Sequence, residues 1–170
     1  MMREYSNLEK IRLEKVAQLR DQGVEPYPAQ SERSHTSQEA IAEFEAVENK
    51  VDAEVSATLV GRIRSMRPMG KITFAHIEDG AGRIQIFLRA NDIGQEQLEF
   101  FNHYFDLGDF IQANGVMFRT RTGEPTLRVK AFHMLAKAIT PLPAAKDEVI
   151  DGEKLEQNIR LKRGDVVVVP

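Results

Sequence analysis

The segment KITFAHIED alternates strictly between two kinds of side chain, and this pattern limits the possible folds more than any other feature of the chain. Ala75 and Ile77 share one face of the predicted strand, because successive side chains of a strand point to opposite faces. Phe74 and His76 share the other face. The next run, GRIQIFL, alternates in the same way, and a short turn at 79–82 joins the two runs. The pair is therefore predicted to form an antiparallel hairpin.

Three more runs with strand character surround this hairpin. ATLVGRIRSM precedes it, and DLGDFIQANGVMFRT and PTLRVKAFHML follow a predicted helix at 95–104. Gly115 lies inside the fourth run, where it indicates a bulge or a bend. This order predicts a fold that is mainly β with α: a five-stranded OB-fold Greek-key barrel preceded by an N-terminal helical extension. The predicted core of the barrel comprises Leu59, Ile63, Ala75, Ile77, Ile84, Ile86, Val116, Leu127 and Val129.

The first part of the chain has helical rather than strand periodicity. Ser6 and Thr36 each precede a glutamate by three residues, which is the spacing of a capping box. Apolar residues then recur at helical spacing, and this predicts helices over 7–22 and 37–48. Gly23 and the prolines that follow it end the first helix. We expect these helices to pack on the barrel.

The distribution of charge agrees with a division into three segments. Residues 1–55, the predicted helical extension, carry 7 basic and 12 acidic side chains. Residues 56–143, the predicted OB-fold domain, carry 11 basic and 8 acidic side chains. Residues 144–170 form a linker or tail of open role, with a predicted strand at 166–169. The positive charge is therefore concentrated on the barrel, although the whole chain has a net charge of −3.

Composition and motifs exclude several kinds of chemistry. The chain has no cysteine, and its 4 histidines lack the spacing of metal ligands, so we predict no metal site. No phosphate-binding loop motif is present, and no catalytic residue is predicted. Asp106 and Asp109 are expected to form a turn around Gly108 rather than an acid–base pair. Without a membrane-length apolar run or a secretory signal, a cytoplasmic protein that contacts no membrane is expected.

The outer face of the hairpin is the candidate binding surface. Phe74 shares this face with Gln85, and several arginines lie nearby in the sequence. An exposed ring can stack on an unpaired base, a contact of about 1–3 kcal/mol. A glutamine amide can both donate and accept at a base edge, and arginines bind phosphates. The pattern indicates a surface that binds single-stranded nucleic acid. The alternative is that the Phe74 ring lies in the core, because an error of one residue in assigning the strand exchanges its two faces.

Longer stretches of the chain resemble a known family. GRIRSMRPMGKITFAHIEDGAGRIQIF is similar to the anticodon-binding barrel of bacterial-type class II lysyl-tRNA synthetases. So are DLGDFIQANGVMFRTRTGEPTLRVKAFHMLAKAITPLP downstream of it and RLEKVAQLRDQGVEPYP upstream. The resemblance covers roughly residues 8–143. Aspartyl and asparaginyl synthetases share the barrel pattern, but MGK, the RTGE turn and the PLP segment are closer to the lysyl enzymes.

The resemblance implies a set of nucleic-acid-binding residues. Phe74 would stack on the central uridine of the lysine anticodon, and Gln85 would read that base. Arg67 would contact the base or a phosphate, and Glu124, in the turn between the last two strands, would contact an anticodon nucleotide. The implied partner is the anticodon stem-loop of lysine tRNA, with a homodimer as a second expectation. Positive charge or flanking contacts are expected from Arg62, Arg64, Lys71, His76 and Phe87.

The resemblance ends after residue 143. In the family this point leads into a catalytic domain that binds ATP, magnesium and lysine, and the 27 residues 144–170 do not resemble it. The parent enzyme would attach lysine to its tRNA with ATP. This chain is expected to bind no cofactor and to be inactive alone, and whether it is a truncation, a fusion or a paralogue stays open.

Two other functions are open on sequence grounds. A stand-alone OB-fold protein, or a paralogue derived from a synthetase, would bind single-stranded nucleic acid without preference for one anticodon loop. An interaction module would instead use the acidic helices and the valine-rich end of the chain, and it would bind no RNA.

Overall fold

The structure is a computed structural model, and it describes residues 3–143. The strand predicted at 166–169 lies outside the described residues. Four helices and five strands are present in this range, in the order expected from the sequence except for the short helix α3, which was not predicted. The helices are α1 (Asn7–Asp21), α2 (Ser37–Val47), α3 (Ala90–Ile93) and α4 (Gln95–Tyr104). The strands are β1 (Ser56–Met69), β2 (Ile72–Glu78), β3 (Arg83–Arg89), β4 (Phe110–Arg119) and β5 (Pro125–Ala136).

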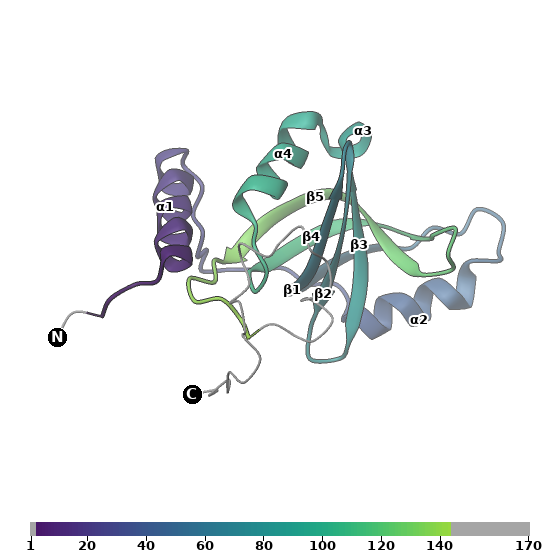
Figure 1. Ribbon diagram of the computed structural model, residues 1–170. Coiled ribbons are helices and arrows are strands. Elements are labelled where there is room, and N and C mark those ends of the chain that lie inside the picture. Colours follow the sequence, from purple (N-terminus) through teal and green to yellow (C-terminus); the bar gives the residue numbers. More distant parts are fainter. Residues whose placement is uncertain (1–2, 144–170) are drawn as a thin grey trace, which may run out of the picture.

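The five strands close into a barrel in the order β1-β2-β3-β5-β4, which confirms the predicted OB-type fold. Neighbouring strands are antiparallel except β3 and β5, which are parallel. Figure 1 shows α4 above the strands and α2 below them, with α1 standing beside the barrel. The helix predicted at 95–104 coincides with α4, and its buried side chains Leu98 and Phe101 belong to the barrel core.

The core confirms the predicted inward positions with one exception. Val116 was expected inside, but it is only partly buried, and its neighbour Met117 occupies the interior at 4% exposure. Ile111 and Ala113 are fully buried, so the inward positions of β4 fall on odd residue numbers and Val116 faces outward. The expectation was wrong because two apolar residues stand side by side, and only the alternation of the whole strand decides between them.

Gly115 is required by a close approach of two backbones. The register between β4 and β5 shifts between Asn114 and Gly115, so the predicted irregularity is confirmed. A Cβ atom at this position would lie 2.0 Å from the backbone oxygen of Arg128 on β5. No side chain fits there without separating the two strands.

The helix α2 is fixed to the β2–β3 hairpin by Asp79. The Asp79 carboxylate accepts hydrogen bonds from the backbone N–H and the hydroxyl of Ser37, both at 2.7 Å. It also accepts from the backbone N–H groups of Ala81 and Gly82 within its own turn. Partial burial opposes ionisation of this carboxyl, but these four donors outweigh it and lower its pKa. The predicted capping box at Thr36 is present as well.

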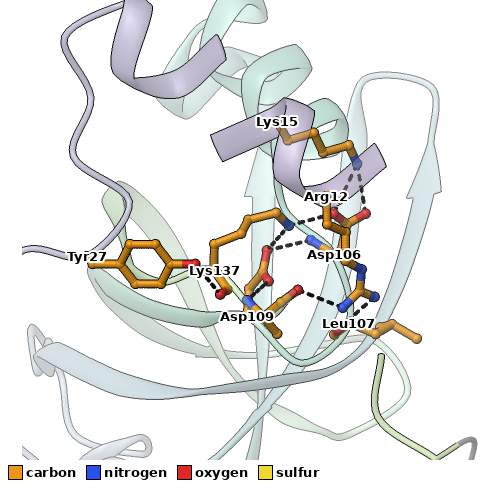
Figure 2. Close-up of polar contacts among 8 residues, drawn as sticks. Arg12, Lys15, Tyr27, Asp106, Leu107, Asp109 and Lys137 are labelled. Atoms are coloured by element: carbon orange, nitrogen blue, oxygen red, sulfur yellow. Dashed lines mark hydrogen bonds and ion pairs between the residues drawn. The ribbon is translucent and has the colours of Figure 1, made fainter. Parts of the chain in front are cut away.

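The helix α1 is fixed to the other side of the barrel by a cluster of charged residues, which Figure 2 shows. Lys137, at the end of β5, has a fully buried side chain and donates to Asp106 at 2.5 Å and to Asp109 at 2.6 Å. Lys15 of α1 donates to the other oxygen of Asp106 at 2.8 Å. We call Lys15, Asp106, Asp109 and Lys137 the charged joint.

Backbone groups complete the charged joint. Arg12 of α1 donates to the carbonyl oxygens of Ala138 and Leu107, at 2.8 and 3.2 Å (Figure 2). The Asp109 carboxylate accepts from the backbone N–H groups of Asp106 and Ala138. Asp106 and Asp109 therefore do form the expected turn, but they also bind lysines from both ends of the described chain, which the sequence analysis did not anticipate. The predicted packing of the N-terminal helices on the barrel is confirmed.

None of the helices in residues 3–143 is both long enough and apolar enough to cross a lipid bilayer.

Candidate nucleic-acid interface

The register of the strands places the candidate residues in two parallel rows on the outer face of the barrel. One row crosses four strands through Arg67, Phe74, Phe87 and Arg128, each paired directly with the next. We call it the aromatic row. Because residues directly opposite each other on neighbouring strands have their Cβ atoms about 5 Å apart, these side chains form one continuous surface.

Three phenylalanine rings are in contact here, two from the aromatic row and a third, Phe118, from β4 beside it. The ring centroids of Phe74 and Phe87 are 4.9 Å apart, and Phe118 of β4 lies 5.7 Å beyond Phe87. The Arg128 guanidinium lies over the Phe118 ring at 5.0 Å. All three rings are half-buried, so they keep faces or edges open to solvent. The arrangement can stack unpaired bases, because every base has an aromatic face.

The second row is polar, and it runs through Ser65, His76, Gln85 and Thr126 on the same four strands. We call it the polar row. Its members are joined by hydrogen bonds: Ser65 Oγ lies 3.0 Å from His76 Nδ1, and the Thr126 hydroxyl donates to Gln85 Oε1 at 2.9 Å. His76 Nε2 lies 2.8 Å from Oε1 of Glu124, which projects from the β4–β5 turn. The polar row and Glu124 therefore form one connected surface next to the rings.

Gln85 lies on the expected face but is less exposed than expected. Its side of the strand is confirmed, since Ile84 and Ile86 point into the core. Only 6% of Gln85 is accessible, and its neighbour Thr126 is completely buried. Its amide oxygen is held by the Thr126 hydroxyl, whereas its amide nitrogen has no hydrogen bond within residues 3–143. The nitrogen is thus the end of the amide that can donate to an incoming group.

Hydrogen bonds within the β4–β5 turn fix the backbone of Glu124. The backbone N–H of Thr120 donates to the Glu124 carbonyl at 3.1 Å, and the Thr120 hydroxyl accepts from the Glu124 N–H at 3.0 Å. Gly123 has a φ of 91°, in the region that favours glycine. The Glu124 side chain is 42% exposed. One carboxylate therefore projects from a rigid turn toward the aromatic and polar rows.

The basic residues predicted for this site are spread along it. Arg67 is exposed at the end of the aromatic row, and no ion pair involves it within the described part of the chain. Arg64 lies 3.9 Å from Glu78, further along β1. The Arg62 guanidinium covers the Phe110 ring at 4.7 Å. Lys71 is exposed in the β1–β2 turn. The structure thus places Arg67 in the aromatic row, whereas the other three are members of neither row.

Four further residues of this site are not among those predicted from the sequence. They are Ser65 of β1, Phe118 of β4, and Thr126 and Arg128 of β5. A weak signal existed, because Phe118 and Thr126 alternate with core residues of their strands. The parallel pairing of β3 with β5, which places Thr126 beside Gln85, could not be read from local patterns. Among the described residues, no group of three His, Asp or Glu side chains could hold a metal ion.

Comparison with known proteins finds similarity to one domain family and to one group of enzymes. Residues 57–135 match the model of the OB-fold nucleic acid binding domain. Lysine-tRNA ligase of Pelotomaculum thermopropionicum is 41% identical over 165 residues, which cover 97% of this chain and 31% of that protein. The Bacillus subtilis ligase is 37% identical, covering 94% of this chain and 32% of that protein. For Chloroflexus aurantiacus the identity is 46%, covering 82% of this chain and 28% of that protein.

This chain spans about a third of the length of the lysine-tRNA ligases that it matches. The matched region includes the barrel with the aromatic row, the polar row and Glu124. The barrel therefore matches the OB-fold nucleic acid binding domain, and the chain as a whole is similar to about a third of a lysine-tRNA ligase.

Proposed function

We propose that this chain binds the anticodon loop of lysine tRNA through the aromatic row, the polar row and Glu124. Phe74 stacks on the central uridine of the anticodon, and the Gln85 amide nitrogen donates to a carbonyl of that base. Glu124 accepts a hydrogen bond from an anticodon nucleotide, and Arg67 binds the same base or the neighbouring phosphate. The nine residues predicted to bind nucleic acid thus divide into this central group and a surrounding set.

The observation that supports this proposal is the alignment of the two rows across four strands. An aromatic surface alone would bind any unpaired base, because stacking tolerates every sequence. A donor and an acceptor held directly beside the rings add a requirement for particular base edges. Stacking with adjacent hydrogen-bonding groups is the usual way in which proteins recognise unpaired RNA bases.

The similarity to lysine-tRNA ligases supports the identity of the RNA. Those proteins carry a name that describes attachment of lysine to tRNA, and this chain spans about a third of their length. We assign the ATP- and magnesium-dependent attachment of lysine to the remaining two thirds, and anticodon recognition to this chain. The homodimer implied by the resemblance stays a prediction, which sedimentation velocity of the chain at two concentrations would test.

Fluorescence anisotropy with labelled anticodon stem-loops tests the proposal. One loop carries the lysine anticodon UUU, and the control loop carries GUC on the same stem. We expect the wild-type chain to prefer the UUU loop at a fixed salt concentration. Phe74→Ala removes the stacking ring, a contact of about 1–3 kcal/mol, so affinity for the UUU loop should fall by about 5- to 150-fold.

A matched control variant separates this effect from a general loss of aromatic surface. Tyr5→Ala removes an aromatic ring that is 42% exposed and precedes α1, away from the barrel face. It should leave both affinities unchanged. Equal binding of the two loops by the wild type would contradict the proposal and favour a general single-strand-binding protein. Absence of binding to either loop would contradict it as well and favour an interaction module.

A further inference from the structure

A chain of hydrogen bonds crosses the outer face from β1 to the β4–β5 turn. Ser65 of β1 contacts His76 of β2 at 3.0 Å, and His76 contacts the Glu124 carboxylate at 2.8 Å. Glu124 follows His76 by 48 residues in the sequence. A residue in the middle of the sheet therefore holds the side chain of a residue in a turn.

The partners of His76 decide where its ring carries a proton. The carboxylate can only accept, so Nε2 must carry a proton and donate to Oε1 of Glu124. In the neutral ring Nδ1 then has no proton and accepts from the Ser65 hydroxyl. In the charged ring Nδ1 donates to the same hydroxyl oxygen. In either form the contact with Glu124 is a hydrogen bond to an ionised group, which is the stronger kind.

Without this contact the Glu124 side chain would have little to hold it. Its backbone is fixed by Thr120, but the side chain is 42% exposed, and His76 is the only partner of its carboxylate within residues 3–143. A glutamate side chain without a partner loses its rotamer freedom when a ligand orders it, and this loss weakens binding. The half-buried imidazole, 23% exposed, removes much of that freedom before any ligand arrives.

The contact also leaves part of the carboxylate available. Oε1 faces His76, and Oε2 makes no hydrogen bond in the described part of the chain. The available oxygen lies on the same surface as the polar row, on which Gln85 presents a donor. A carboxylate with one oxygen held and one oxygen open is preorganised to accept from an N–H or O–H group of a nucleotide.

We propose that His76, supported by Ser65, is a positioning residue for anticodon recognition, which orients the Glu124 carboxylate toward the bound nucleotide. This inference rests on the proposed function, because Glu124 contacts RNA only if the outer face binds it. Its rival is a structural role, in which the His76–Glu124 contact merely fastens the β4–β5 turn. The two roles differ in a measurable way: a positioning residue acts on RNA affinity through Glu124 and therefore has no effect once the carboxylate is absent.

A double-mutant cycle with the UUU stem-loop tests this difference. Glu124→Gln removes the ionised acceptor, and we expect affinity to fall by about tenfold, the range of a hydrogen bond to a charged group. His76→Leu should weaken binding by about three- to tenfold. In the double variant, His76→Leu should add nothing to the loss caused by Glu124→Gln.

Three further variants sharpen the cycle. His76→Gln keeps an amide N–H that can replace the Nε2 donor, and we expect it to restore most of the affinity lost in His76→Leu. Ser65→Ala removes only the support of the ring, and about a twofold loss is expected. Phe74→Ala combined with His76→Leu should show additive losses, because the stacking ring does not act through Glu124. Thermal unfolding of each variant reports whether the barrel itself is intact.

The outcomes separate this inference from the proposed function. If the wild type prefers the UUU loop and Phe74→Ala abolishes the preference, the proposed function stands. Positioning by His76 is then overturned if Glu124→Gln has no effect, if His76→Leu has none, or if their losses add. If the wild type shows no preference between the UUU and GUC loops, the proposed function fails and this inference fails with it. If His76→Leu does not fold, Ser65→Ala takes its place in the cycle: its twofold loss should disappear in the Glu124→Gln background, and a twofold loss that persists there overturns the inference.

Discussion

The charged joint and the outer face use similar polar residues in opposite ways. In the joint, the side chains of Lys137, Asp106 and Asp109 are at most 3% exposed, and each has several partners. On the outer face, Glu124 is 42% exposed with one oxygen open, and Arg67 has no ion pair within residues 3–143. Polar groups whose hydrogen bonds and ion pairs are all made within the protein stabilise the fold. Polar groups with free donors or acceptors lie on the surface that we assign to RNA.

The difference follows from the energetics of burial. A buried charge is stable only when its partners replace the water that it has lost. A charged joint with unpaired groups would therefore lower the stability of the fold. An exposed charge keeps its water until a ligand displaces it, so it can remain incomplete at little cost. We therefore expect variants of the joint to change the free energy of unfolding, and variants of the face to change mainly RNA affinity.

The largest expected effect on stability comes from Lys137→Met. This variant keeps the side-chain volume but, among residues 3–143, leaves Asp109 buried with no ammonium partner and Asp106 with Lys15 alone. Removing one partner of a buried ion pair costs about 3–5 kcal/mol. Urea unfolding followed by circular dichroism measures this loss. Lys130→Met is the matched control, because Lys130 is 46% exposed and its only ion pair in the described range, with Asp92, is 3.4 Å long.

The same variant tests the separation between the two regions. At a temperature where Lys137→Met is still folded, its affinity for the UUU stem-loop should match that of the wild type. Phe74→Ala should do the reverse and change affinity far more than stability. A large loss of RNA affinity in folded Lys137→Met would show that the two regions are coupled.

A smaller effect is expected at Asp79, where α2 is fixed to the hairpin. Its carboxylate accepts four hydrogen bonds from Ser37, Ala81 and Gly82. Asp79→Asn replaces an ionised acceptor by a neutral one, and we expect a loss of about 1 kcal/mol at neutral pH. Urea unfolding at pH 7 measures it, with RNA affinity expected to stay unchanged.

The lowered pKa of Asp79 gives this effect a definite pH dependence. Burial opposes ionisation, but the four donors outweigh it and place the pKa below its ordinary value of 3.8. The folded state thus binds the proton less tightly than the unfolded chain, so ionised Asp79 contributes its full stability above pH 3.8. The contribution is lost as the pH falls through the lower folded value. The difference between wild type and Asp79→Asn should therefore shrink below pH 3.8, and a constant difference would contradict this account.

Most of the fold could be predicted because it depends on local patterns. The alternation around Phe74 predicts the β2–β3 hairpin, and the capping boxes at Ser6 and Thr36 predict where α1 and α2 begin. Val116 shows the limit of such patterns. It and Met117 are both apolar, and local hydrophobicity does not say which of them points inward.

The charged joint could not be predicted because its members are far apart in the sequence. Lys15 and Lys137 both bind Asp106, although 91 and 31 residues separate them from it. A lysine met in a sequence is usually exposed, so nothing local marks Lys137 as fully buried. The candidate site could be predicted only in part. The alternation of the strands predicts that Phe74 and Gln85 share one face, whereas the position of Thr126 beside Gln85 depends on the parallel pairing of β3 with β5.

The smallest effect is expected at Arg119, which links α2 to the end of β4. Its guanidinium forms ion pairs with Glu48 at 2.7 Å and with Glu45 at 3.6 Å, and it lies 5.7 Å from the centre of the Phe44 ring. The arginine is 34% exposed, unlike Lys137, and water can replace its partners when they are lost. Solvent-exposed ion pairs of this kind contribute little to stability, because water screens the charges and replaces the lost partner.

Arg119→Ala therefore compares an open ion pair with a buried one in the same molecule. Urea unfolding should show a loss of only a small fraction of that in Lys137→Met, and added salt should reduce it further because exposed charges are screened. The loss in Lys137→Met should depend far less on salt, since its carboxylates have no contact with solvent. If Arg119→Ala lowered the free energy of unfolding as much as Lys137→Met, burial would not be what distinguishes the two contacts. The contrast between the charged joint and the outer face would then depend on the geometry of the contacts alone.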